Sequence, residues 1–243
     1  YQAAYNNTEQ TVTAFGYKAG YTQSGGTPGS NTWIGWQAGL SATTGGANTA
    51  VGREALALTT TGAYNTAVGA EALENNTTAS ENTAVGYKAA YTGTTADAVT
   101  AVGAFAMLYN TTGASNTALG KVALQDNTTG SYNTAVGRSA LENNTTASNN
   151  TAVGYQAGYT TSTGDSNTFV GEDAGYSTVG NRNTFVGREA GRASNLSATQ
   201  QNTFVGTFSG RYVTSGAKNT ILGAYDGNQG GLDIRTSSNN IVL

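Results

Sequence analysis

The chain has 243 residues, of which only 10% are charged, and it carries a net charge of −3 with no cysteine and no histidine. This charge balance excludes the basic surface that is needed to neutralise nucleic-acid phosphates. The missing residue types exclude disulfides, thiolate or histidine metal sites, and catalytic triads with a histidine base.

The first residues match the second half of a repeated unit. Tyr1-Gln2-Ala3-Ala4-Tyr5 matches residues 17–21 and 155–159. We therefore expect the chain to be a fragment of a longer protein. No apolar run approaches the roughly 20 residues that cross a bilayer, and no signal peptide opens the chain. An external protein would need another export route or a leader upstream.

A unit of the type Asn-Thr-Ala-Val-Gly recurs along the whole chain, mostly at intervals of 17 residues. Self-similarity at a short fixed period is typical of solenoids, in which each unit stacks on the next. We number each copy from its motif glycine as position zero. The motif glycines are Gly16, Gly35, Gly52, Gly69, Gly86, Gly103, Gly120, Gly137, Gly154, Gly171, Gly187, Gly206 and Gly223.

The spacing stays at 17 from Gly35 to Gly171 and then changes to 16 and 19, which indicates changes of loop length around a constant coil. Loops such as Asn127-Thr128-Thr129-Gly130 contain residues that suit turns, and Pro28 falls in an early loop with extra residues. After Gly223 the pattern ends, and residues 239–243 resemble either one more copy or the entry to the next domain. We therefore predict a solenoid repeat domain over 1–226 and a C-terminal transition segment over 227–243.

The unit is too short for two helices and a turn, and β-branched residues precede each motif glycine. These features predict short parallel strands. The predicted fold class is all-β, a parallel β-solenoid or β-roll of about 13 coils with a 17-residue period.

Positions minus two and minus one are apolar in every copy, although neighbours in a strand point to opposite faces. We therefore predict a strand that is buried on both faces. A single roll would leave one face open, so a homotrimer, intertwined or side by side, is the predicted partner. The predicted core residues are Val51, Val68, Val136, Phe169, Phe185 and Phe204.

Residue size at position minus two changes in the opposite sense to residue size at plus four. Alanine at minus two accompanies leucine or methionine at plus four, whereas Trp33, Phe169, Phe185 and Phe204 accompany glycine. This exchange predicts that the two positions share one buried face. Copies that are small at both positions carry tyrosine pairs, which we expect to fill or cover the gap: Tyr17/Tyr21, Tyr87/Tyr91 and Tyr155/Tyr159.

An asparagine column at position minus four is interpreted as a structural ladder of stacked side chains rather than a binding site for ions or sugars. Val99 interrupts this column. The residues assigned to the structural ladder are Asn48, Asn65, Asn82, Asn116, Asn133, Asn150, Gly52, Gly69, Gly86, Gly120, Gly137 and Gly154.

The sequence indicates no catalytic, cofactor-binding or metal-binding residue, and we predict that the protein is not an enzyme. The acidic pair Glu172/Asp173 could suggest a glycosidase, but neighbours on a strand face apart and a repeating roll offers no cleft. Charges such as Arg53/Glu54 indicate a solvated face. Tyrosines could stack on sugar rings, although packing inside the roll is favoured. The residues that bind a receptor are not identified.

The Asn-Thr-Ala-Val-Gly copies resemble the Asn-Ser-x-Ala-Ile-Gly repeats of trimeric autotransporter adhesin heads, which form left-handed parallel β-roll trimers. The 17-residue form with Asn-Thr-Thr-Gly is more similar to repeats in bacteriophage tail fibres. Residues 227–243 resemble the segment that leads into an endosialidase-type intramolecular chaperone, which trimerises such fibres and then cuts itself off. No catalytic residue of that chaperone lies within this chain.

The resemblance implies the rigid structural shaft of a trimeric phage tail fibre, an extracellular virion component. Such a shaft carries or spaces a receptor-binding tip and could itself attach to a host-surface glycan or protein. One alternative is a trimeric surface adhesin or filament on a bacterial cell. A remote alternative is an ice-binding solenoid, since regular threonine columns can order water. No cofactor, nucleic acid or membrane insertion is expected.

Overall fold

The computed structural model describes residues 2–6, 11–23, 30–193 and 201–243. The prediction for Pro28 lies outside the described residues. The chain divides into two compact units, Tyr1–Lys121 and Val122–Leu243. In the part of the chain that the structure describes, each unit is a parallel β-solenoid, and a short strand precedes each of the thirteen motif glycines. The described residues contain no helix.

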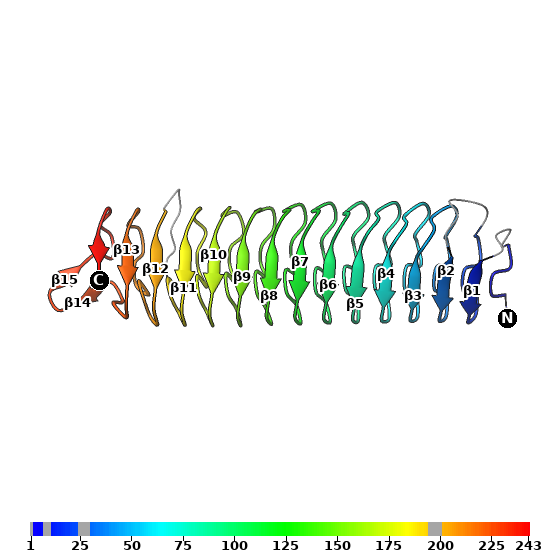
Figure 1. The fold of residues 1–243 in the computed structure, drawn as a ribbon, viewed down its shortest axis with the longest axis horizontal. Helices are drawn as coiled ribbons and strands as arrows, with labels where there is room; N and C mark the ends of the chain where they lie inside the picture. Colours follow the sequence, from blue (N-terminus) through cyan, green and yellow to red (C-terminus); the bar gives the residue numbers. More distant parts are fainter. Residues whose placement is uncertain (1, 7–10, 24–29, 194–200) are drawn as a thin grey trace. The chain divides into compact units, whose positions relative to one another are not determined.

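In the first unit, strands β1 to β7 stack in chain order, and each pairs in parallel with the next (Figure 1). The strands are β1 (Val12–Phe15), β2 (Asn31–Ile34), β3 (Thr49–Val51), β4 (Thr66–Val68), β5 (Thr83–Val85), β6 (Thr100–Val102) and β7 (Thr117–Leu119).

In the second unit, β8 to β13 stack in the same way, and β16 pairs in parallel with β13. Of the two predictions for residues 239–243, one more copy or the entry to another domain, the structure agrees with one more copy, because β16 continues the stack. An antiparallel hairpin, β14–β15, precedes it. The strands are β8 (Thr134–Val136), β9 (Thr151–Val153), β10 (Thr168–Val170), β11 (Thr184–Val186), β12 (Thr203–Val205), β13 (Thr220–Leu222), β14 (Asn228–Gln229), β15 (Leu232–Asp233) and β16 (Ile241–Val242).

The strand register survives the changes of repeat length. Phe169 pairs with Phe185 across the 16-residue interval, and Phe185 pairs with Phe204 across the 19-residue interval. The differences in length are therefore absorbed in the connections, as the constant coil predicted.

Main-chain hydrogen bonds join consecutive coils away from the strands as well. Leu56 N–H donates to the Ala72 carbonyl at 3.0 Å on the wall opposite the strands, and Thr60 N–H donates to the Thr77 carbonyl at 2.8 Å in the loop. Because buried peptide groups need partners, bonding around the coil fixes each coil on the next.

The motif glycines turn the chain out of the strand with φ between 121° and 143°. A Cβ atom on Gly137 would lie 2.4 Å from the carbonyl oxygen of Gly154 in the next coil, so no other residue fits there. Positions plus two and plus four are also left-handed, with φ of 58° at Glu54 and 51° at Leu56. This wall is consequently a series of turns rather than a second sheet.

The size exchange between positions minus two and plus four has a direct steric cause. A Cβ atom on Gly191 would lie 2.4 Å from the Phe185 ring, and one on Gly175 would lie 2.4 Å from the Phe169 ring. Where the strand carries alanine, as at Ala118, a leucine at plus four is fully buried. The two positions face each other across a narrow interior, which has room for no more than one large side chain from the two positions of a coil.

The aromatic residues at minus two form a buried stack in the second unit. Phe169, Phe185 and Phe204 are all fully buried. The centroids of Phe185 and Phe204 lie 4.8 Å apart with nearly parallel rings, and those of Phe169 and Phe185 lie 5.7 Å apart. The prediction that Phe169, Phe185 and Phe204 lie in the core is confirmed.

The valine part of the predicted core is wrong for the single chain. Val68 is 36% exposed, and Val51 and Val136 are only partly buried. Position minus two points into the coil, so its neighbour at minus one must point outward. The coil closes on one face of the strand only, and the second face stays open.

The tyrosine pairs, which the sequence predicts to fill or cover the remaining gaps, do not fill them in two copies. Gly20 faces the Trp33 ring and Gly158 faces the Phe169 ring, each from the following coil. The rings reach across the coil spacing of about 4.8 Å. Tyr17 and Tyr155 instead lie at the surface, where each is more than 40% exposed.

Replacing Phe185 with alanine should lower the free energy of unfolding by about 3–5 kcal/mol because a buried ring is lost. Adding Gly191→Leu should restore at least ~1 kcal/mol, since contacting sites couple and other coils combine alanine with leucine. Thermal and urea unfolding of both variants measure this. Additive losses in the double variant would show that the two positions do not share space.

Candidate functional site: the outward face of the sheet

The outward face of each sheet consists of positions minus three and minus one. Threonine occupies the first and an aliphatic residue the second in every strand from β3 to β12. Val85 in the first unit and Val153, Val170 and Val205 in the second are each 37% exposed. Each unit therefore presents an uncharged, regularly spaced face of threonine and aliphatic side chains.

The asparagine ladder lies on the inward side of the coil and is used by the fold. Asn133 is fully buried; its Oδ1 accepts the Asn150 N–H at 3.0 Å, and its Nδ2 donates to the Ala147 carbonyl at 2.8 Å. One side chain thus bonds to the next coil and to the turn of its own coil. The predicted ladder members are all buried: Asn48, Asn65, Asn82, Asn116, Asn133 and Asn150.

A second asparagine column at plus seven explains why the ladder tolerates Val99. Val99 N–H still donates to Asn82 Oδ1 at 2.8 Å, but valine has no amide to cap its own turn. Asn110 Nδ2 donates to the Gly113 carbonyl at 2.8 Å and satisfies that turn instead. The sequence showed this column within its loops, but not its hydrogen bonds.

Three carboxylates meet on the first unit, and of these the sequence indicated only Glu54, as part of a solvated face. Oxygens of Glu54, Glu71 and Glu74 lie within 4.8 Å of one another. Arg53 forms ion pairs with Glu54 and Glu71, and Lys88 Nζ lies 3.1 Å from Glu71. The carboxylates are oxygen ligands of the kind hard cations prefer, but these two basic side chains already compensate Glu71. Their common signal is the repeated charge at plus two and plus five of neighbouring coils.

The surroundings shift the pKa values of Glu71 and Glu74 in opposite directions. Burial alone would raise the pKa of Glu71, but hydrogen bonds from Lys88 and Arg53 outweigh it and hold that pKa below its ordinary value. Burial, together with the charges of Glu54 and Glu71, raises the pKa of Glu74. The cluster is therefore an ion-pair network around one well-compensated carboxylate.

The acidic pair Glu172/Asp173 is likewise engaged in ion pairs. Glu172 lies 3.6 Å from Arg188 Nε, and Asp173 lies 3.1 Å from Arg192 Nε. Each of the two carboxylates is thus paired with an arginine of the next coil.

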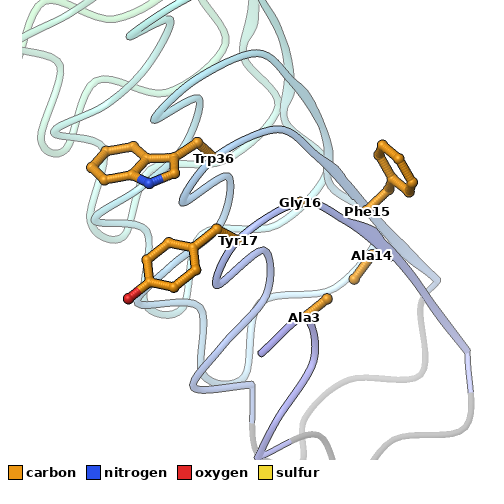
Figure 2. Close-up of a pocket in the computed structure, with 6 residues that line it drawn as sticks. All are labelled: Ala3, Ala14, Phe15, Gly16, Tyr17 and Trp36. Atoms are coloured by element: carbon orange, nitrogen blue, oxygen red, sulfur yellow. The ribbon is translucent and has the colours of Figure 1, made fainter. Parts of the chain in front are cut away.

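An apolar cavity of about 890 Å³ lies at β1, the edge strand of the first unit. Figure 2 shows Tyr17 and Trp36 projecting to one side from neighbouring coils, whereas Phe15 projects to the other side. The Tyr17 and Trp36 rings are roughly parallel, with centroids 6.4 Å apart. The remaining lining residues are Ala3, Ala14 and Gly16, so the cavity offers apolar contact without a carboxylate or a basic group.

A second, more polar cavity of about 450 Å³ lies beside the β14–β15 hairpin in the second unit. Its charged residues are Asp233 and Arg235, which form a bidentate pair with distances of 3.0 and 2.7 Å. Side-chain and main-chain hydrogen bonds from Arg235 lower the pKa of Asp233 to about 2. The pair is therefore fully charged at neutral pH.

Comparisons with protein-family models, with curated proteins and with solved structures gave no match. Within the described ranges, no helix has the length and apolar character to span a membrane.

Replacing Asn133 with alanine should lower the free energy of unfolding by about 2–4 kcal/mol, because a buried N–H and a buried carbonyl each lose a partner. Chemical denaturation measures this change. Thr129→Ala is the matched control, since Thr129 lies exposed in the adjacent loop. Equal effects of the two changes would contradict a structural role of the ladder.

Replacing Arg235 with glutamine should return the pKa of Asp233 from about 2 towards its ordinary 3.8. Because the folded-state pKa is depressed, the pair stabilises the fold above pH 3.8 and loses that contribution as the pH falls towards 2. Carboxyl chemical shifts followed by NMR during a pH titration test this. An unchanged titration of Asp233 in the variant would show that Arg235 is not the cause.

Proposed function

We propose that the chain is the structural shaft of a trimeric bacteriophage tail fibre, a virion component outside the cell that spaces a host-attachment tip and has no catalytic role. The observation that carries this proposal is the outward face of partly exposed aliphatic side chains that recurs on successive coils. Apolar positions repeated in this way are typical of surfaces that another protein covers.

A second copy of the same chain is the partner that fits this face. The aliphatic and threonine columns repeat with the spacing of the coils, and a second copy has that spacing by construction. The two columns carry no charge in β3 to β12, so identical faces meet without repulsion. The threefold symmetry is taken from the resemblance of the repeats to adhesin-head and tail-fibre repeats.

The energetics favour association through many weak contacts. Burying the exposed third of a valine contributes roughly 0.5–1 kcal/mol. Association costs on the order of 4–15 kcal/mol in lost translational and rotational freedom. A few valines would not offset that cost, whereas the same contact repeated along both units would. The regular repeat thus suits a shaft better than a small docking patch.

Ice binding is the second candidate, because threonine lies on the outward face beside the aliphatic column. Thr66 and Thr83 are partly exposed on that face next to Val68 and Val85. This candidate needs the face to be open to water, so it competes with the trimer for one surface. A thermal-hysteresis assay of the intact chain distinguishes the two.

A bacterial surface adhesin would use the same shaft and the same trimer.

The intact chain should have a solution mass of three times 24.6 kDa by analytical ultracentrifugation. The double variant Val153→Asp/Val170→Asp should be monomeric, because charges would replace adjacent residues of the aliphatic column. The control Thr129→Asp/Thr146→Asp adds the same charge in exposed loops and should stay trimeric. A monomeric or dimeric mass for the unmodified chain would contradict the proposal.

A further inference from the structure

The β14–β15 hairpin departs from the repeated coil at a defined place. The ladder residues Asn219 and Asn240 are 21 residues apart, and Asn240 N–H still donates to Asn219 Oδ1 at 2.9 Å. The extra length forms the hairpin while the ladder continues. Ile234 anchors it, since its side chain is buried and its N–H donates to the Gly227 carbonyl at 2.9 Å.

Main-chain bonds hold the hairpin against the preceding coil. Thr214 N–H and Ser215 N–H both donate to the Arg235 carbonyl, at 2.7 and 3.2 Å. Tyr225 Oη donates to the Leu232 carbonyl at 2.5 Å. These hydrogen bonds hold the backbone of the segments that line a cavity. The lining residues are Tyr212, Thr214, Asp233, Arg235 and Thr236.

The side chains of this cavity combine an aromatic ring with polar groups. Tyr212 is 45% exposed, and the Arg211 guanidinium carbon lies 5.2 Å from the centroid of its ring. The pair between Asp233 and Arg235 uses Nε and Nη2 of the guanidinium, so Nη1 is not part of it. Thr214 and Thr236 add hydroxyl groups.

An aromatic ring beside charged and hydroxyl groups favours a sugar as the ligand. A sugar ring has an apolar face that suits an aromatic face, and its hydroxyls match charged donors and acceptors. An acidic sugar would meet the Asp233 carboxylate, or would have to displace it from Arg235. A purely apolar ligand would remove the ion pair from water without replacing its hydrogen bonds.

We propose that this cavity beside the hairpin binds a neutral pyranose unit of a glycan, with the ring stacked on Tyr212 and its hydroxyls bonded to Asp233 and Arg235. The site would let the shaft itself contact host glycans, and this role rests on the proposed function in host attachment. It lies within one unit of one chain and does not depend on the trimer.

Saturation-transfer NMR on the full chain tests the site with methyl glucopyranoside, methyl galactopyranoside and methyl mannopyranoside. At least one of them should bind with a Kd on the order of 1 mM, as befits a ligand with few atoms. Tyr212→Ala should weaken this binding about tenfold or more, and Asp233→Asn should weaken it too. Tyr132→Ala is the control, since Tyr132 is exposed elsewhere in the same unit.

Circular dichroism and melting of each variant establish that the fold is kept. Absence of transfer to all three glycosides would overturn the proposal, as would an equal loss in the Tyr132 and Tyr212 variants. Stronger binding of methyl glucuronide than of any neutral glycoside would overturn the assignment of a neutral sugar. The sedimentation mass is unaffected by these results, so failure of the glycan site is distinguishable from failure of the trimeric shaft.

Discussion

Each coil must lie directly on the next at the spacing of a β-sheet, with its peptide groups bonded to the neighbouring coils. The motif glycine meets this constraint at the corner, where a Cβ atom on Gly137 would collide with the Gly154 carbonyl. The asparagine at minus four meets it beside the strand, since Asn133 bonds to the next coil and caps its own turn. The regular stacking of the coils therefore accounts for the repeated glycine and asparagine.

The interior left inside such a coil is narrow, and its volume determines which side chains occur together. A ring at position minus two leaves no room for a Cβ atom at plus four, as Phe185 and Gly191 show. Aromatic rings also extend into the adjacent coil, so Gly158 is matched to Phe169 of the next coil rather than to its own strand. Packing is thus shared between neighbouring coils, and changes in size are compensated along the stack as well as within one coil.

The two surfaces with functional interest differ in kind. The outward sheet face is periodic, uncharged and partly apolar, which suits self-association along many coils. The cavity beside the hairpin is local and carries the charged pair Asp233–Arg235, which suits recognition of a small polar group. A repeated surface and a single insertion can therefore serve different roles without sharing residues.

The sequence alone determined the strand positions, the parallel stacking, the constant register and the buried phenylalanine column, because all of these follow from the repeat and from residue volume. It also indicated that Asn133 and its equivalents are structural. Only the tertiary structure decided which strand face is open, since alternation assigns Ala and Val to opposite faces without saying what covers either. The left-handed turns at Leu56, the carboxylates around Glu71 and the cavity at Tyr212 likewise depend on side chains from different coils, whose approach is set by the coil geometry and not by local sequence.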